Sequence, residues 1–217
     1  MSERPGYEIV SLTEVERYPD PRHDGPVLLP LRWLLDLRAF GANAWTAPVG
    51  RQAVPRHQED SGDDELYVVV KGRATFTVDE ETLDAREGTL VYVSTGVTRE
   101  AVAEEPETIV LAVGATPGEP YAARGWDEVV VAFAKARAGD VEGGRTVLET
   151  LVARQPDEWP GAYNVACFEA LYGDRDLAFP ALERAVELDA EAVRNHAPQD
   201  DDLAILHEDP RWQELFG

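Results

Sequence analysis

Glu65-Leu-Tyr-Val-Val-Val-Lys-Gly72 and Gly88-Thr-Leu-Val-Tyr-Val-Ser-Thr-Gly-Val-Thr-Arg99 are the two stretches of the chain that decide its fold. Each joins a short apolar run, rich in valine, leucine and tyrosine, to glycines. Runs of this length and composition predict β-strands, and the glycines predict the turns that end them. The two stretches therefore predict part of a β-structure in the first half of the chain.

Further strands are predicted around these two stretches. Ala74-Thr-Phe-Thr-Val78 contains an alternating pattern, and Thr108–Val113 is another apolar run. We expect Asp79-Glu80-Glu81 to form a hairpin turn and Glu87-Gly88 to form a second. Short strands of this kind between about residues 39 and 113 favour a small antiparallel barrel or jelly roll.

The two opening stretches resemble the two sequence motifs of the cupin family. The first motif, G-x5-H-x-H-x(3,4)-E-x6-G, is matched in its second half by Glu65, a six-residue strand and Gly72. The second motif, G-x5-P-x-G-x2-H-x3-N, is matched at Gly88, at Gly96 and in its spacing. The resemblance implies a double-stranded β-helix of the jelly-roll type.

The metal-ligand positions of these motifs are mostly changed. His57 is the only histidine upstream in the first motif, Glu59 stands two residues later, and Arg99 replaces the histidine of the second motif. A guanidinium is a permanent cation without a usable lone pair, so Arg99 cannot replace a metal-binding imidazole. Because motif positions in a cupin barrel face one cavity, the resemblance implies an internal ion pair of Arg99 with Glu65, or a pocket for a small anion.

A reduced metal site of His57, Glu59 and Glu65 is a second interpretation, because carboxylates suit Mn²⁺ or Fe²⁺. Repulsion from Arg99 would weaken such a site. The alternatives without a metal are a hydrogen-bonding role for His57 and a hydrated acidic loop for residues 59–65. We therefore expect no resident cofactor, and a divalent metal is the alternative.

The second half of the chain has the period of helices. Ala138-Gly139-Asp140 recurs as Tyr172-Gly173-Asp174, 34 residues later. That spacing and the segment Tyr163-Asn164-Val165-Ala166 resemble tetratricopeptide repeats. The resemblance implies two helical hairpins, and Tyr163 and Asn164 are the candidate interaction face. Two repeats need caps at their ends, and the tail is one candidate, because Asp200–His207 and Pro210–Phe216 look like short helices.

The expected fold is thus α+β and multidomain, an N-terminal cupin jelly-roll barrel followed by C-terminal tetratricopeptide-like hairpins. The boundaries that follow are an arm with a short helix at 1–38, the barrel at 39–115, a linker at 116–124, the hairpins at 125–190 and capping helices at 191–217. The short helix is suggested by Pro30–Arg38, and the linker by Thr116-Pro-Gly-Glu-Pro120.

Composition excludes some partners. The chain has 42 Asp and Glu against 20 Lys and Arg, which gives a formal net charge of −22, and no basic tract. Nucleic acid and anionic membrane surfaces both bind clustered cations, so neither is an expected partner. The first thirty residues suggest neither a signal peptide nor a membrane span, and we expect a cytoplasmic protein. Cys167, the one cysteine, is expected to be a buried thiol on a helix.

The leading hypothesis is a non-enzymatic protein that binds a small molecule, a protein partner, or both, through a degenerate cupin barrel without a transition metal and a repeat module. The first alternative is a metal-dependent cupin dioxygenase or isomerase that uses His57, Glu59 and Glu65. The second is metal-free acid–base chemistry, as in sugar epimerases that resemble this superfamily, with His57 and a carboxylate acting on an anion held by Arg99. The resemblances also imply self-association, for instance as a homodimer.

Overall fold

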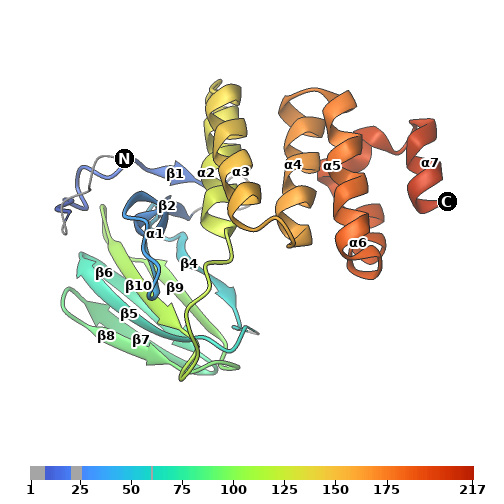
Figure 1. Cartoon of the computed structure of the whole chain (residues 1–217). Coiled ribbons are helices and arrows are strands. Elements are labelled where there is room, and N and C mark those ends of the chain that lie inside the picture. Colours follow the sequence, from blue (N-terminus) through green and yellow to red (C-terminus); the bar gives the residue numbers. More distant parts are fainter. Residues whose placement is uncertain (1–7, 21–25, 60) are drawn as a thin grey trace. The chain divides into compact units, whose positions relative to one another are not determined.

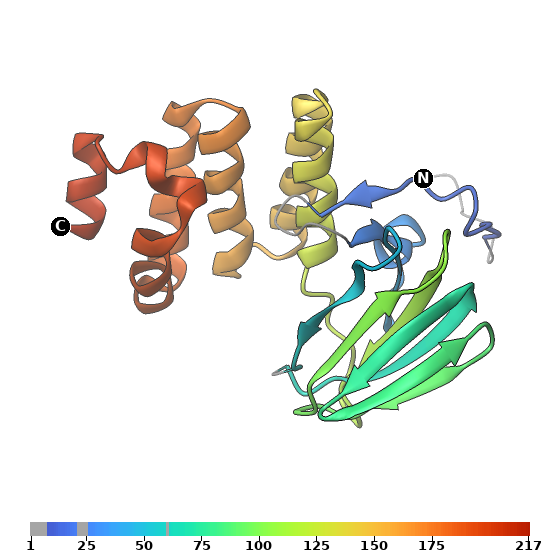
Figure 2. The ribbon, with the colours of Figure 1, turned by 180° about the vertical axis from the view of Figure 1, so that it is seen from behind.

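The computed structural model describes residues 8–20, 26–59 and 61–217. It divides into two compact units, Met1–Asp127 and Glu128–Gly217. The strands lie in the first unit and most of the helices in the second, as Figures 1 and 2 show from opposite sides. A β unit followed by a helical unit agrees with the predicted α+β class.

The strands of the first unit form two sheets in which all neighbours are antiparallel. One sheet contains, in spatial order, β1 (Tyr18–Pro19), β2 (Val27–Leu29), β3 (Gly41–Thr46), β10 (Ile109–Ala115), β5 (Asp64–Lys71) and β8 (Leu90–Val93). The other contains β4 (Gln52–His57), β9 (Arg99–Ala103), β6 (Arg73–Val78) and β7 (Glu81–Arg86). The predicted jelly-roll sandwich is confirmed.

The core of this unit lies between the two sheets. Tyr67 and Val69 of β5 and Phe76 of β6 are at most 1% exposed and belong to one apolar cluster. Successive side chains of a strand point to opposite faces, so these alternate residues fill the interior. Arg99 and Ala101 of β9 follow the same alternation and are completely buried. The pattern thus turns the Arg99 side chain into the sandwich.

Gly72 shows why the motif glycines are needed. Its φ is +76°, and a Cβ there would lie 2.6 Å from Thr108 Oγ1. A residue with a side chain would be strained by both the left-handed backbone and the contact. Gly88 and Gly96 also have positive φ, +84° and +78°, in the turns that flank β8. These glycines therefore mark the end of β5 and the two ends of β8.

The N-terminal segment, predicted as an arm with a short helix, also adds two strands to the larger sheet. β1 and β2 extend the larger sheet through the pairing of β2 with β3. The predicted helix is present but short, α1 (Leu31–Leu34). Leu29 and Leu31 pack into a second apolar cluster with Ala44 and Ile109, which explains why this segment joins the sheet. Residues 116–125 form neither helix nor strand.

The second half of the chain forms a succession of helices. They are α2 (Trp126–Arg137), α3 (Val141–Arg154), α4 (Trp159–Tyr172), α5 (Arg175–Leu188), α6 (Ala190–His196), η1 (Ala197–Gln199), η2 (Asp201–Leu206) and α7 (Pro210–Phe216). Phe133 of α2 packs its ring edge-on against Phe168 and Tyr172 of α4, with ring centroids 5.7 and 5.9 Å apart. Among the described residues, no helix has the length and apolar character needed to cross a bilayer.

Aspartates begin five of these helical segments. Each accepts a hydrogen bond from a backbone N–H of the first turn, an interaction that stabilises helix starts. The capping residues are Asp140, Asp174, Asp189, Asp200 and Asp209. Part of the acidic excess therefore has a structural use in the helical unit.

The helix breaks fall at Gly139 and Gly173, where the 34-residue repeat places them. The tail forms η2 and α7 at the two predicted places, and α6 precedes them. The helices themselves are thus established. That the hairpins are tetratricopeptide repeats stays a prediction.

Candidate functional site in the barrel

The candidate site is assembled from three strands. His57 is the last residue of β4, and its cross-strand partner is Arg99, the first residue of β9. Glu65 is the second residue of β5, which lies in the opposite sheet and pairs there with β8 and β10. The fold thus brings together residues from both motifs, as the resemblance implied.

His57 has one ring nitrogen engaged with the backbone and one directed at carboxylates. Its Nδ1 lies 2.7 Å from the carbonyl oxygen of Pro55, which assigns the proton to Nδ1. Its Nε2 lies 3.7 Å from Glu59 Oε1 and 3.7 Å from Glu65 Oε2. Burial lowers the pKa of His57, but the interactions with the Glu65 carboxylate and the Pro55 carbonyl outweigh it, so the net pKa is raised.

Glu65 is the centre of the network. It accepts a hydrogen bond from the Tyr67 hydroxyl, and its Oε2 lies 3.3 Å from Arg99 Nε. Burial raises the pKa of Glu65, whereas His57, Tyr67 and Arg99 lower it, and the net shift is downward. The pKa of Tyr67 is raised by its burial and by the charge of Glu65. Glu65 is therefore held as a carboxylate.

Arg99 is completely buried. Its Nη2 donates to the Ser94 carbonyl at 3.5 Å, and its Nη1 has no hydrogen-bond partner in the described part of the chain. The predicted internal pairing of Arg99 with Glu65 is present as an ion pair at 3.3 Å. A buried guanidinium stays charged, so Glu65 is its counter-ion.

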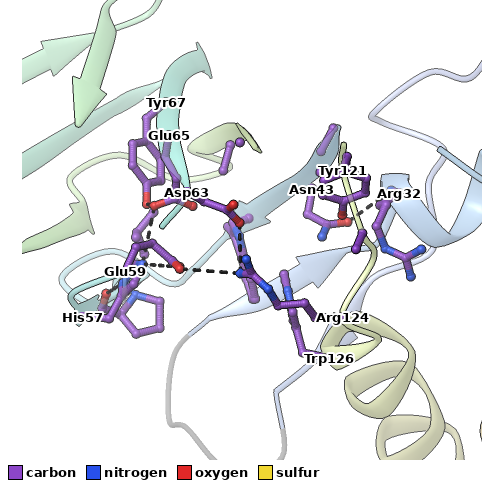
Figure 3. A pocket seen from close by; sticks show the side chains of 18 residues that line it. Arg32, Asn43, His57, Glu59, Asp63, Glu65, Tyr67, Tyr121, Arg124 and Trp126 are labelled. Carbon is purple, nitrogen blue, oxygen red and sulfur yellow. Dashed lines mark hydrogen bonds and ion pairs between the residues drawn. The ribbon is translucent and has the colours of Figure 1, made fainter. Parts of the chain in front are cut away.

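A cavity of about 330 Å³ opens beside this network (Figure 3). His57, Glu59, Asp63 and Glu65 line one side of it, but Arg99 does not line it. The anion-binding role predicted for Arg99 is therefore not supported, because Arg99 already pairs with Glu65 and the carboxylates that face the cavity would repel an anion.

Arg124 lies across the carboxylates in Figure 3. Its Nη1 is 2.9 Å from Asp63 Oδ2 and 3.9 Å from Glu59 Oε2. Arg124 comes from the segment predicted to end the linker, whereas Asp63 precedes β5. Its guanidinium thus neutralises part of the charge of the acidic loop. Asp60 lies outside the described residues.

The rest of the cavity wall is aromatic and amide in character. Trp45 and Trp126 stack with centroids 5.7 Å apart and planes 6° from parallel, and both line the cavity. Tyr121 and Asn43 also line it, and Asn43 Oδ1 accepts from the backbone N–H of Arg32 at 3.3 Å. No sequence motif marked these residues, because they come from β3, from the segment before α2 and from the first residue of α2.

The arrangement of these side chains shows how well they fit the metal ion that the motifs imply. One donor atom each from His57, Glu59 and Glu65 lies within 4.8 Å of the others, and His57 Nε2 is the nitrogen that could bind a metal. The three residues of the predicted metal site, His57, Glu59 and Glu65, thus lie close together. The donor set nevertheless fits a transition metal poorly, because it has one imidazole and the charge of Glu65 is already balanced by the buried Arg99.

The candidate residues of the helical region have other roles. Tyr163 is only 4% exposed, and its hydroxyl donates to Asp200 Oδ2 at 2.7 Å. Asn164 donates to the Pro160 carbonyl of the preceding turn at 2.8 Å. Tyr163 is therefore not available as an interaction face, because the segment after α6 covers it. His23 lies outside the described residues.

The β unit can be compared with known proteins. The family model of the cupin domain matches residues 43–114, from β3 to β10. Residues 43–114 match the cupin domain. This cupin domain contains His57, Glu59, Glu65 and Arg99, while Tyr121, Arg124 and Trp126 lie beyond it. No curated protein matches the chain.

Parts of the chain are also similar to solved structures. KdgF from Halomonas sp. is 17% identical with a TM-score of 0.34, over 46% of this chain and 91% of that one. A cupin protein from Bacteroides fragilis is 18% identical with a TM-score of 0.40, over 55% and 92%. A sugar phosphate isomerase of the cupin superfamily from Silicibacter pomeroyi is 24% identical with a TM-score of 0.43, over 51% and 77%. Likeness at this level says nothing of the activity of this chain.

Proposed function

We propose that the cupin domain is a non-catalytic binding domain for a small polar molecule and works without a transition metal. The observation that carries this proposal is the completely buried Arg99, 3.3 Å from Glu65, at the position of a ligand histidine. A permanent cation at that position balances the negative charge of Glu65, the one motif carboxylate, and repels a metal ion.

The cavity favours a neutral ligand with hydroxyl groups. Glu59 and Glu65 offer carboxylate oxygens that accept hydrogen bonds, and Arg124 offers N–H donors opposite them. Trp45 and Trp126 offer aromatic faces, against which an apolar ring face can pack. A volume of about 330 Å³ lies at the lower end of the range of small-molecule pockets. A polyol or sugar of small size combines these properties.

Two measurements on protein purified without a histidine tag test the proposal. Elemental mass spectrometry should find the same transition-metal content in wild type and His57→Ala, because the barrel holds no such metal. Titration with a panel of neutral polyols and sugars should change the tryptophan fluorescence, and Trp126→Phe should assign that change to the cavity. For a bound compound, Glu59→Gln should weaken affinity about tenfold, the loss of one charged hydrogen bond.

The matched control is Glu81→Gln, an exposed carboxylate on β7 that should leave the affinity unchanged. Near-stoichiometric metal that disappears in His57→Ala, together with turnover of a small molecule, would contradict the proposal. That result would support the metal-dependent enzyme, for which the convergence of His57, Glu59 and Glu65 is the structural argument.

A further inference from the structure

A second group of metal-ligating side chains lies in the helical unit, away from the barrel. Cys167 comes from the middle of α4, and Asp200 and Asp202 come from the start of η2. One donor atom from each of the three lies within 4.8 Å of the others. Cys167 Sγ lies 3.9 Å from Asp200 Oδ2. The thiol and the carboxylates thus converge although they are more than thirty residues apart.

A fourth donor stands beside this group. His196 is the last residue of α6, and its Nε2 lies 3.9 Å from Asp200 Oδ2. Its side chain is 62% exposed, and its ring packs against the rings of Trp159 and Tyr163, which keeps the imidazole beside the group. Thiolate, imidazole and carboxylate are the three ligand types that proteins use for zinc.

We propose that Cys167, His196, Asp200 and Asp202 form a Zn²⁺ site. In a tetrahedron with metal–ligand bonds of about 2.0 to 2.3 Å, neighbouring ligand atoms are roughly 3.3 to 3.8 Å apart. The contacts of Asp200 Oδ2 with Cys167 Sγ and His196 Nε2, both 3.9 Å, come within a few tenths of an ångström of that spacing. Binding releases the thiol proton of Cys167 to solvent, because the thiolate is the ligand.

The surroundings support a built site rather than a chance surface group. Cys167 is 2% exposed and faces Asp200 from inside the helical core. The Tyr163 hydroxyl donates to Asp200 Oδ2 at 2.7 Å, and Asp200 Oδ1 accepts from the backbone N–H of Asp202 at 3.0 Å. Hydrogen bonds of this kind orient metal-binding carboxylates. A bound zinc would fasten the segment after α6 to α4.

The test uses the full chain without a histidine tag, stripped with a chelator and titrated with Zn²⁺ in competition with a chromophoric chelator. We expect one equivalent to bind and to raise the melting temperature. Cys167→Ser and Asp202→Asn should each weaken binding at least tenfold. Tyr163→Phe, which removes only the orienting hydrogen bond, should weaken it about tenfold. Glu81→Gln, at an exposed position on β7, should leave zinc binding unchanged.

Co²⁺ supplies a readout that identifies the sulfur ligand. Wild type loaded with Co²⁺ should show a sulfur-to-cobalt charge-transfer band, and Cys167→Ser should lack it. His196→Gln, at an exposed position that leaves folding intact, should keep the band and lower the affinity. An adventitious ion only, bound equally by wild type and Cys167→Ser without the band, would overturn the proposal.

Discussion

Arg99 and Glu65 form an ion pair across the interior of the cupin domain, with Arg99 Nε 3.3 Å from Glu65 Oε2. Arg99 is completely buried, whereas the Glu65 side chain is 16% exposed and lines the cavity. The guanidinium thus stands behind the carboxylate that faces the ligand space. This pairing holds the Glu65 carboxylate in place as a hydrogen-bond acceptor. Arg99 also competes with any metal ion for the negative charge of Glu65.

Restoring a histidine should restore metal affinity. In Arg99→His an imidazole replaces the cation at the cross-strand partner of His57, where side chains are neighbours. We expect this variant to bind Mn²⁺ or Fe²⁺ at least tenfold more tightly than wild type, measured by calorimetry. Arg99→Gln is the control, because it removes the charge without adding a strong ligand. Equal affinity in the two variants would show that position 99 does not reach the carboxylates.

The pairing of His57 with Glu65 should make stability depend on pH. The pKa of His57 is raised from 6.5, so its contribution is complete below 6.5 and is lost as pH rises through the folded value. The pKa of Glu65 is lowered from 4.5, so its contribution is present above 4.5 and is lost as pH falls through the folded value. His57→Gln should therefore destabilise the protein most between these two ordinary pKa values, by about 1 kcal/mol.

Urea unfolding of wild type and His57→Gln across this range checks the pH prediction. The difference in unfolding free energy should shrink toward alkaline pH, where His57 is neutral in both states. A difference that stays constant with pH would mean that His57 acts through packing or the Pro55 contact alone.

Arg32 and Asp127 should be essential for the stability of the first unit. Arg32 Nε and Nη2 each donate to a different oxygen of Asp127 at 2.7 Å, and both side chains are at most 4% exposed. Arg32→Met leaves a buried aspartate without this cation and should cost about 3 to 5 kcal/mol in denaturant unfolding. Arg38→Met, which breaks the exposed pair with Asp36, should have no measurable effect. Equal effects would contradict the role of burial.

Two glycines of the helical unit should respond differently to alanine. A Cβ on Gly144 of α3 would lie 2.6 Å from the Ala132 carbonyl oxygen of α2 and 2.8 Å from the Phe168 ring. Gly144→Ala should therefore destabilise by about 1 to 3 kcal/mol, since α3 must move away. In Gly161→Ala the Cβ meets only Val152, with Cγ2 at 3.3 Å and Cα at 3.9 Å, and the change should be nearly neutral. Thermal unfolding of both variants measures this difference. If Gly144→Ala left the stability unchanged, α2 and α3 could separate without a cost in free energy.

Most of the fold could be predicted from patterns within short stretches of the sequence. The strands β5, β6 and β8 were predictable because alternation and β-branched runs fix which face each residue takes. The turns at Gly72 and Gly88 were predictable because few other residues accept their positive φ. β1 and β2 were not predicted, since a two-residue and a three-residue strand are too short to show a period and form by pairing with β3.

Only those residues of the candidate site that belong to the two motifs could be predicted from the sequence. His57, Glu59, Glu65 and Arg99 follow from the resemblance, and the structure places them together. Tyr163 was predicted as a candidate interaction face, and its own helix does not reveal that the segment after α6 covers it.

The sequence by itself determined the two periods of the chain, the cupin motifs and the replacement of a ligand histidine by Arg99. These are local properties, which residue spacing and side-chain chemistry fix without reference to distant segments. Only the tertiary structure decided that Glu65 shields Arg99 from the cavity, that Arg124 meets Asp63 and that Cys167 meets Asp200. Such contacts join residues more than thirty positions apart, and they depend on the packing of whole strands and helices, which no short pattern records.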